Sequence, residues 1–145
     1  SGGELALDVE PTVPMRGDLL REAVSVADVV FVTKDSLAML GVPSIERLAQ
    51  PGQWVILTEG KRGSSGIAAG MRKPVIQKAH PAVTVDTTGA GDCYHAALIA
   101  ARLDGAELPE AMAFASAAAA SKVEHRGARG GLPTRDEVEL RLARP

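Results

Sequence analysis

The pattern of hydrophobic and polar positions divides the chain into short apolar runs and longer helix-favouring segments. The runs typical of strands in a parallel sheet lie at 4–9, 28–33 and 54–58. The segments typical of helices lie at 18–26, 34–40, 44–49, 91–103, 107–124 and 134–143. Pro133 and Thr134 form a typical start for the last of these helices. Alternating strands and helices predict a three-layer α/β/α fold around one sheet.

The pattern changes after residue 58. Two short apolar runs, at 67–69 and 75–78, are separated by Gly70 and a basic turn. This arrangement predicts an antiparallel hairpin at the edge of a mostly parallel sheet. We therefore expect one domain over residues 4–145, and we interpret residues 1–3 as a linker or a cloning remnant.

The segment 86–99, DTTGAGDCYHAALI, combines a glycine turn, a carboxylate and a helix start. The β-branched residues at 83–85 favour an extended approach to it. Gly89, Ala90 and Gly91 form a turn with little side-chain bulk, where backbone N–H groups can approach an anion closely. Because a helix starts here, its unpaired N–H groups and its dipole, equivalent to about half a positive charge, favour a bound anion.

Asp92 has two interpretations on the sequence alone. It can be the N-cap of the helix, which is a common role for Asp. It can instead be a general base beside a bound phosphate, where it would take a proton from a substrate hydroxyl. The two roles differ in geometry, because a base faces the ligand whereas a cap folds back onto backbone N–H groups.

The string D-T-T-G-A-G-D, followed by three residues and then by small and apolar positions, resembles the second signature of the ribokinase-like (PfkB-type) carbohydrate kinases. The resemblance implies a kinase that phosphorylates a sugar with ATP and Mg²⁺. In that family Asp92 would be the catalytic base, and Gly89, Ala90 and Gly91 would form the anion hole for the transferred phosphoryl group. The intact motif favours sugar-like or nucleoside acceptors over vitamins.

A second segment of the chain resembles the same family. Thr58 and Gly60, which follow a buried strand, resemble the T-x-G turn that lies against the nucleotide phosphates. We place Gly63 and residues 64–66 in the loop that continues from it. The other interpretation is a plain turn between two strands, with its basic residues in solvent.

The Ala-rich helix MAFASAAAAS and the loop RGARGGLP complete the resemblance. The helix would border the adenine, so Ser116 and Ala119 are candidate adenine neighbours, although alanines at such spacing more often reflect only tight helix packing. The loop would close the nucleotide site. In some members of the family this loop helps to hold a monovalent cation such as K⁺. The ligands in this chain would be backbone carbonyls near Gly127 together with Asp86 and Thr88.

One family motif is altered in this chain. Many relatives carry N-x-x-E after a strand, a pair that helps to organise magnesium and phosphate. Thr33 and Ser36 stand at the matching positions of segment 27–40, and neither is a carboxylate. This version resembles the ketohexokinase-like branch. Asp35 is a weak substitute, so the part this segment plays in binding magnesium stays open.

Composition narrows the classes of function. A net charge of -2, one Trp, one Tyr and two Phe argue against nucleic-acid binding, which needs a basic face and stacking aromatics. No apolar run approaches the roughly 20 residues of a membrane span. Cys93 is the single cysteine, which favours a reduced, cytoplasmic location and a packing role for its side chain. The three histidines, at 80, 95 and 125, lack the spacing of a metal site.

Length suggests that part of the family fold is missing. The resemblance covers the carboxy-terminal half of a sugar kinase, so we expect a partial ribokinase-like fold that is inactive by itself. A truncated sheet exposes a strand edge, which favours a homo-oligomer or association with the missing amino-terminal half. Two other hypotheses remain: a non-catalytic module that binds nucleotide or assists assembly, and a kinase of this fold that acts on a nucleoside or vitamin.

Overall fold

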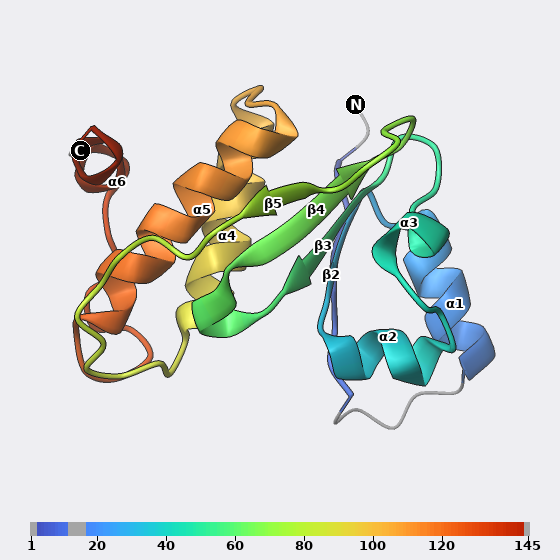
Figure 1. The fold of residues 1–145 in the computed structure, drawn as a ribbon, viewed down its shortest axis with the longest axis horizontal. Coiled ribbons are helices and arrows are strands. Elements are labelled where there is room, and N and C mark those ends of the chain that lie inside the picture. Colours follow the sequence, from blue (N-terminus) through green and yellow to red (C-terminus); the bar gives the residue numbers. More distant parts are fainter. Residues whose placement is uncertain (1–2, 12–16, 144–145) are drawn as a thin grey trace. The chain divides into compact units, whose positions relative to one another are not determined.

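The computed structural model describes residues 3–11 and 17–143, so the interpretation of residues 1–3 as a linker falls almost wholly outside the described residues. The chain divides into two compact units. The first comprises residues 1–59 and 64–76, and the second comprises residues 60–63 and 77–145. Figure 1 labels the helices and strands of both units.

The strands form one sheet in the order β1-β2-β3-β4-β5. Their bounds are Ala6–Val9, Val29–Val32, Trp54–Thr58, Ser64–Ala68 and Val75–Gln77. The pairs β1–β2 and β2–β3 are parallel, whereas β3–β4 is antiparallel, with Thr58 opposite Ser64. The sheet is therefore mixed. Parallel pairs and an antiparallel edge were expected, whereas the expectation that most of the sheet is parallel was wrong. The physical reason is the short connection at 59–63, since a parallel partner for β3 would need a crossover of a dozen or more residues.

Strand β4 begins earlier than the sequence pattern indicated. Ser64, Ser65 and Gly66 belong to the strand and not to the loop before it. Because Ser and Gly favour turns over strands, the local sequence did not indicate a strand at residues 64–66. Pairing with β3 and burial of Ser64 and Ile67 compensate for the weak local preference.

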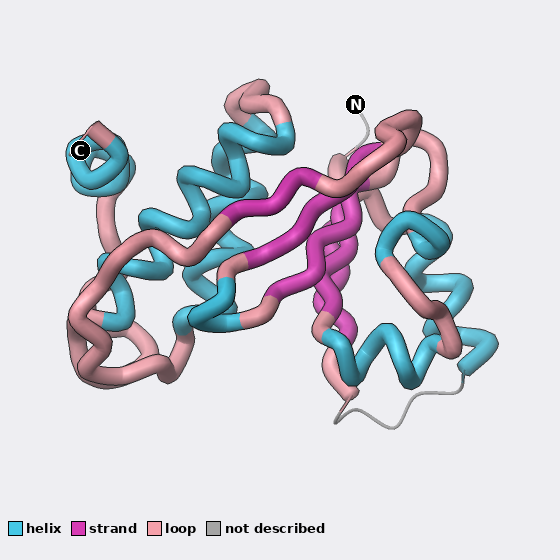
Figure 2. The backbone as a smooth tube through the Cα atoms, viewed as in Figure 1, coloured by secondary structure: helices cyan, strands magenta, loops and turns pink. Residues whose placement is uncertain are grey.

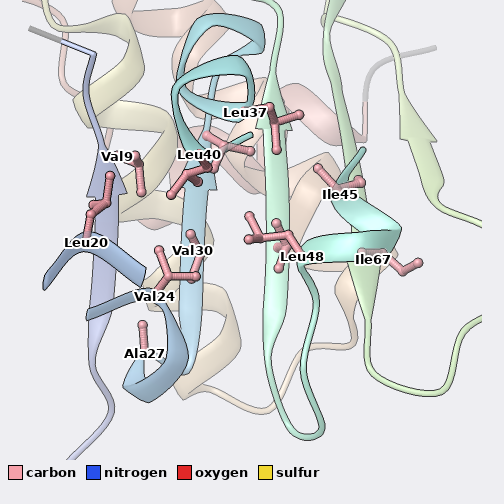
Figure 3. Packing of buried hydrophobic residues seen from close by; sticks show 12 residues of the cluster. Val9, Leu20, Val24, Ala27, Val30, Leu37, Leu40, Ile45, Leu48 and Ile67 are labelled. Atoms are coloured by element: carbon pink, nitrogen blue, oxygen red, sulfur yellow. The ribbon is translucent and has the colours of Figure 1, made fainter. Parts of the chain in front are cut away.

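The first unit packs three helices on its strands. Their bounds are Gly17–Val26 for α1, Lys34–Leu40 for α2 and Ile45–Leu48 for α3. The side chains of these helices meet alternate residues of β2, such as Val30, over one continuous apolar core (Figure 3). Gln53 is buried beside this core, and its amide donates to the carbonyls of Val24 (2.7 Å) and Ala27 (2.8 Å). These bonds fix the carboxyl end of α1 against the turn before β3.

The second unit contains a short 3-10 helix, η1 (Gly60–Arg62), and the helices α4 (Ala90–Leu103), α5 (Leu108–Val123) and α6 (Arg135–Leu142). Helices α4 and α5 pack side by side, and Figure 2 shows the long non-helical segment that leads into α4. Cys93, Ala117, Ala118 and Val138 form a buried cluster of this unit. The packing role expected for Cys93 is confirmed.

Arg141 joins three segments of the second unit. Its guanidinium donates to both carboxylate oxygens of Glu124, at 2.9 and 3.0 Å, and to the carbonyl of Pro81 at 2.7 Å. The ion pair with Arg141 also lowers the pKa of Glu124. Helix α6 therefore fixes both the end of α5 and the segment that leads to residue 86. Among the described residues, no helix has the length and apolar character that crossing a membrane would require.

Candidate functional site

The start of α4 is shaped by Gly89. This residue is the N-cap, with a φ of 77°, and no side chain of the described residues caps this end of the helix. A Cβ at Gly89 would lie 2.8 Å from the carbonyl oxygen of Ala128, so both the backbone conformation and this close approach require glycine. The Cys93 N–H donates to the Gly89 carbonyl at 3.0 Å, which closes the first helical turn. The N–H groups of Gly91 and Asp92 remain available to a ligand.

The backbone conformation and the packing that require glycine at position 89 are absent at Gly91. It lies in the first turn of α4 with ordinary helical φ, and a Cβ there would meet no atom within 4 Å. Glycine inside a helix costs about 1 kcal/mol relative to alanine. Nothing in the described residues explains that cost, whereas a ligand that approaches the backbone at Gly91 would explain it.

Asp92 is the third residue of α4 and is exposed. Because Gly89 occupies the N-cap position of the helix, Asp92 is not the N-cap. Its carboxylate makes no hydrogen bond or ion pair with another described residue. The geometry leaves this carboxylate free to face a ligand bound over the turn.

Asp86 fixes the turn to a distant loop. One carboxylate oxygen accepts from the N–H (2.9 Å) and the hydroxyl (2.7 Å) of Thr88. The other accepts from the N–H of Gly127 at 2.7 Å. These backbone donors, at Thr88 first and then at Gly127, hold the pKa of Asp86 far below its ordinary value. The structure thus brings together three residues that the resemblance groups, Asp86, Thr88 and Gly127.

Lys122 is a residue of this region that sequence reasoning missed. It is fully buried, and its ammonium donates to the carbonyls of Asp86 and His125, both at 3.3 Å. The next residue, Val123, accepts from the N–H groups of Val85 and Asp86 through its carbonyl. The sequence carried little signal of this role, because a lysine in the last turn of a helix is common.

The two candidate adenine neighbours lie on α5. The Ser116 hydroxyl accepts from the N–H of His80 at 2.9 Å and donates to the carbonyl of Lys78 at 3.3 Å. It therefore holds segment 78–80 against α5. Ala119 lies one turn further along and is half-buried. The tight helix packing considered for such residues is present at Ser116, which is buried.

The T-x-G residues fall in different units. Thr58 ends β3 in the first unit, where its hydroxyl donates to the carbonyl of Val32 at 3.5 Å. Gly60 and Gly63 belong to the second unit, and both have positive φ. A Cβ at Gly63 would lie 2.0 Å from the carbonyl oxygen of Gln77, so glycine is required there by the fold itself.

Thr33 and Ser36 are fully engaged in starting α2. The Thr33 hydroxyl accepts from the N–H of Ser36 (3.2 Å), and the Ser36 hydroxyl accepts from the N–H of Thr33 (2.6 Å), which is a complete capping box. Lys34 forms an ion pair with Glu59 at 2.8 Å. Asp35 is exposed in the first turn. Within residues 3–11 and 17–143, no cluster of three or more His, Cys, Asp or Glu residues could hold a metal ion.

Comparison with known proteins places this geometry in a family. A family model described as pfkB family carbohydrate kinase matches residues 8–135. The chain belongs to the pfkB family of carbohydrate kinases. Ribokinase from Bacillus subtilis (strain 168) is 43% identical over 98 residues, which is 68% of this chain and 33% of that protein.

Solved structures show the same fold. A nucleoside kinase from Methanocaldococcus jannaschii has a TM-score of 0.86 and 26% identity, over 96% of this chain and 48% of that chain. A ribokinase II from E. coli, in complex with ATP and Mg²⁺, has a TM-score of 0.80 and 26% identity, over 97% of this chain and 48% of that chain. The chain therefore has a partial α/β ribokinase-like fold and spans about half the length of these solved relatives.

Proposed function

We propose that this chain supplies the ATP-binding and catalytic half of a kinase that phosphorylates a hydroxyl of a sugar or sugar-like molecule. The observation that carries the proposal is the start of α4, where the helix has no side-chain cap and Asp92 has no partner among the described residues. The family match supports ATP as the phosphoryl donor. Gly89, Ala90 and Gly91 are the proposed anion hole. Because the N–H of Ala90 donates to the carbonyl of Thr87 at 3.1 Å, the donors left free in the first turn of α4 are those of Gly91 and Asp92.

The proposed chemistry follows from this arrangement. Asp92 accepts the proton of the substrate hydroxyl while that oxygen attacks the γ-phosphorus, and the bond from phosphorus to the β-phosphate oxygen breaks to leave ADP. The free N–H groups at Gly91 and Asp92, with the positive end of the α4 dipole, stabilise the charge on the transferred group. Such donors are worth about 100- to 1,000-fold in rate in other enzymes.

The remaining proposed contacts concern the nucleotide. Gly60 and Gly127, whose Cβ positions are open, would let backbone approach it, and Gly63 would keep the turn after Gly60 in shape. On α5, the Ser116 hydroxyl already bonds to the backbone of segment 78–80, so Ser116, with the half-buried Ala119, would line the adenine site without a new hydrogen bond.

We expect Mg²⁺ to bind this chain through the phosphates of ATP and not through ligands on segment 33–36. The oxygens at Thr33 and Ser36 are engaged in the capping box, so this segment does not fit a direct ligand set for Mg²⁺. In kinase sites Mg²⁺ keeps several waters and is held largely by the substrate phosphates, which is compatible with such a segment. We infer from the Thr/Ser version of the motif an affinity with the ketohexokinase-like branch.

A nucleoside kinase is the second candidate function. It is favoured by the similarity to the nucleoside kinase of Methanocaldococcus jannaschii. A non-catalytic module is less favoured, because it would have no use for the free carboxylate of Asp92. We further propose a cytoplasmic protein in which this chain associates with an amino-terminal half or with a second copy of itself.

The experiment that tests the proposal is Asp92→Asn in the full-length protein. Without the base, kcat for the phosphorylated sugar or nucleoside should fall by about 100- to 10,000-fold, while ATP affinity changes only a few fold. Asp136→Asn is the matched control, because Asp136 is also an exposed aspartate in the first turn of a helix and lies outside the proposed site. Full turnover in Asp92→Asn would overturn the proposed catalytic role.

A further inference from the structure

The ammonium group of Lys122 lies where the family resemblance implies a monovalent cation. The expected ligands there are Asp86, Thr88 and carbonyls near Gly127. In the structure the carbonyl of Asp86 accepts from the Lys122 ammonium at 3.3 Å, and so does the carbonyl of His125, two residues before Gly127. The residues present therefore do not fit a K⁺ site, because two of the carbonyl oxygens there already accept from an ammonium group of the chain itself.

We propose that Lys122 is a built-in replacement for the monovalent cation, so that this protein needs no K⁺ at the base of its phosphate-binding turn. An ammonium group and K⁺ carry the same charge, and both are bound by carbonyl oxygens. Lys122 is fully buried, so its charge acts in a medium of low dielectric constant and is not screened by water. A second cation at the same carbonyls would be repelled.

The surroundings of Lys122 are those of a bound cation. Besides the two carbonyls, the carboxylate of Asp86 supplies an opposite charge. Hydrogen bonds from Thr88 and Gly127 are the main cause of its lowered pKa, and Lys122 adds a smaller effect in the same direction. Lys122 acts in the same direction on the thiol of Cys93, in the first turns of α4, although burial has the larger effect on that pKa and raises it.

The position of the Lys122 ammonium also indicates how it would support the turn at residues 86–91. Lys122 holds the backbone of Asp86 to that of His125, and Asp86 in turn holds Gly127. The next residue, Ala128, is the one that approaches Gly89 closely. Lys122 is therefore a positioning residue, which fixes the loop 125–128 against the base of the turn and adds positive charge beneath it. Its benefit to phosphate binding rests on the proposed function, whereas its replacement of K⁺ does not.

The test compares thermal unfolding of the full-length protein in KCl, NaCl and choline chloride at equal ionic strength. The Tm of the wild type should be the same in all three salts. Lys122→Ala removes the ammonium and opens a space lined by carbonyls, so its Tm should be lowest in choline chloride and about 3–6 °C higher in KCl. Lys78→Ala is the matched control, because Lys78 is an exposed lysine of the same unit, and its Tm should be equal in all three salts.

A second variant separates charge from hydrogen bonding. Lys122→Gln keeps a donor to the carbonyls but loses the charge, so it should weaken ADP binding by about tenfold in NaCl and leave adenosine binding within twofold. A residue with only a structural role would change both ligands alike. The proposal is overturned if the wild type is stabilised by K⁺, if Lys122→Ala is indifferent to K⁺, or if neither variant folds in any of these salts. Absence of all nucleotide binding with the expected K⁺ response would instead overturn the proposed function alone.

Discussion

Helices α2 and α4 both carry an aspartate in the first turn, yet their starts are built in opposite ways. Thr33 and Ser36 satisfy the backbone donors of α2 with their own hydroxyls. Helix α4 begins at a glycine, has no side-chain cap, and leaves the carboxylate of Asp92 without a partner among the described residues. Helix α2 thus completes its start with its own hydroxyls, whereas at α4 the proposed ligand would complete the start of the helix.

The other long helices of the second unit agree with this interpretation. Helix α5 starts with a capping box between Glu107 and Glu110, and α6 starts with one between Thr134 and Glu137. Capping is worth about 1 kcal/mol for a helix. Helices α5 and α6 thus have side-chain caps at their starts. Helix α4 lacks this stabilisation at the turn that carries the family signature.

Of the substitutions at the two helix starts, Gly89→Ala should cause the largest loss of stability. The new methyl group would need a left-handed backbone conformation and would meet the carbonyl of Ala128, so the free energy of unfolding should fall by about 2–4 kcal/mol. Chemical denaturation measures this loss. Gly52→Ala is the matched control, because Gly52 also has positive φ but open space around its Cβ position, and it should cost about 1–2 kcal/mol. Equal losses in the two variants would show that the contact with Ala128 is unimportant.

Asp86→Asn tests the support of the α4 turn through pH. The pKa of Asp86 is lowered in the folded protein, so its carboxylate stabilises the fold above the ordinary pKa of 3.8 and this contribution is lost as the pH falls below it. The wild type should therefore be more stable than Asp86→Asn at pH 7, and the difference should shrink during acidification from about pH 5 to pH 3. Thermal melts over this range measure it. Parallel curves for the two proteins would contradict a folded-state role for the ionised carboxylate.

Much of the fold was predictable from local patterns. Strand β3 was predicted with its observed bounds, Trp54–Thr58, and α2 with its bounds Lys34–Leu40. The start of β4 was not predictable, because Ser64–Gly66 forms a strand only through its pairing with β3. Local preference and tertiary pairing disagree at this place, and the pairing prevails.

The candidate site divides in the same way. The glycine turn and Asp92 were found in the sequence because their spacing is specific to one family. Lys122 was not found, because its importance depends on the carbonyls of Asp86 and His125, which are brought to it by the fold. The capping role of Thr33 and Ser36 was also missed, although their spacing is that of a capping box, since they were compared with a magnesium motif.

Gly91→Ala should separate folding from ligand binding at the α4 start. The space around its Cβ position is open, so alanine should raise the free energy of unfolding by about 0.5–1 kcal/mol. The same methyl group would occupy the place of a bound phosphate, and ATP affinity should fall about tenfold. Gly17→Ala, in the first turn of α1 and equally open, should leave ATP affinity unchanged. A Gly91→Ala protein that is more stable and binds ATP normally would show that no ligand approaches this residue.

Thr33→Ala removes the side-chain cap of α2 and should have the smallest effect on the proposed activity. The loss of the cap should lower the free energy of unfolding by about 1 kcal/mol, because an N–H donor of α2 and the buried hydroxyl of Ser36 lose a partner. Thr33→Ser keeps the hydroxyl and should restore most of this loss. The dependence of turnover on Mg²⁺ should be the same in both variants as in the wild type, since the Thr33 hydroxyl is engaged in capping. A variant that needs several-fold more Mg²⁺ would instead assign this hydroxyl to the metal, and the contrast between the two helix starts would then fail at α2.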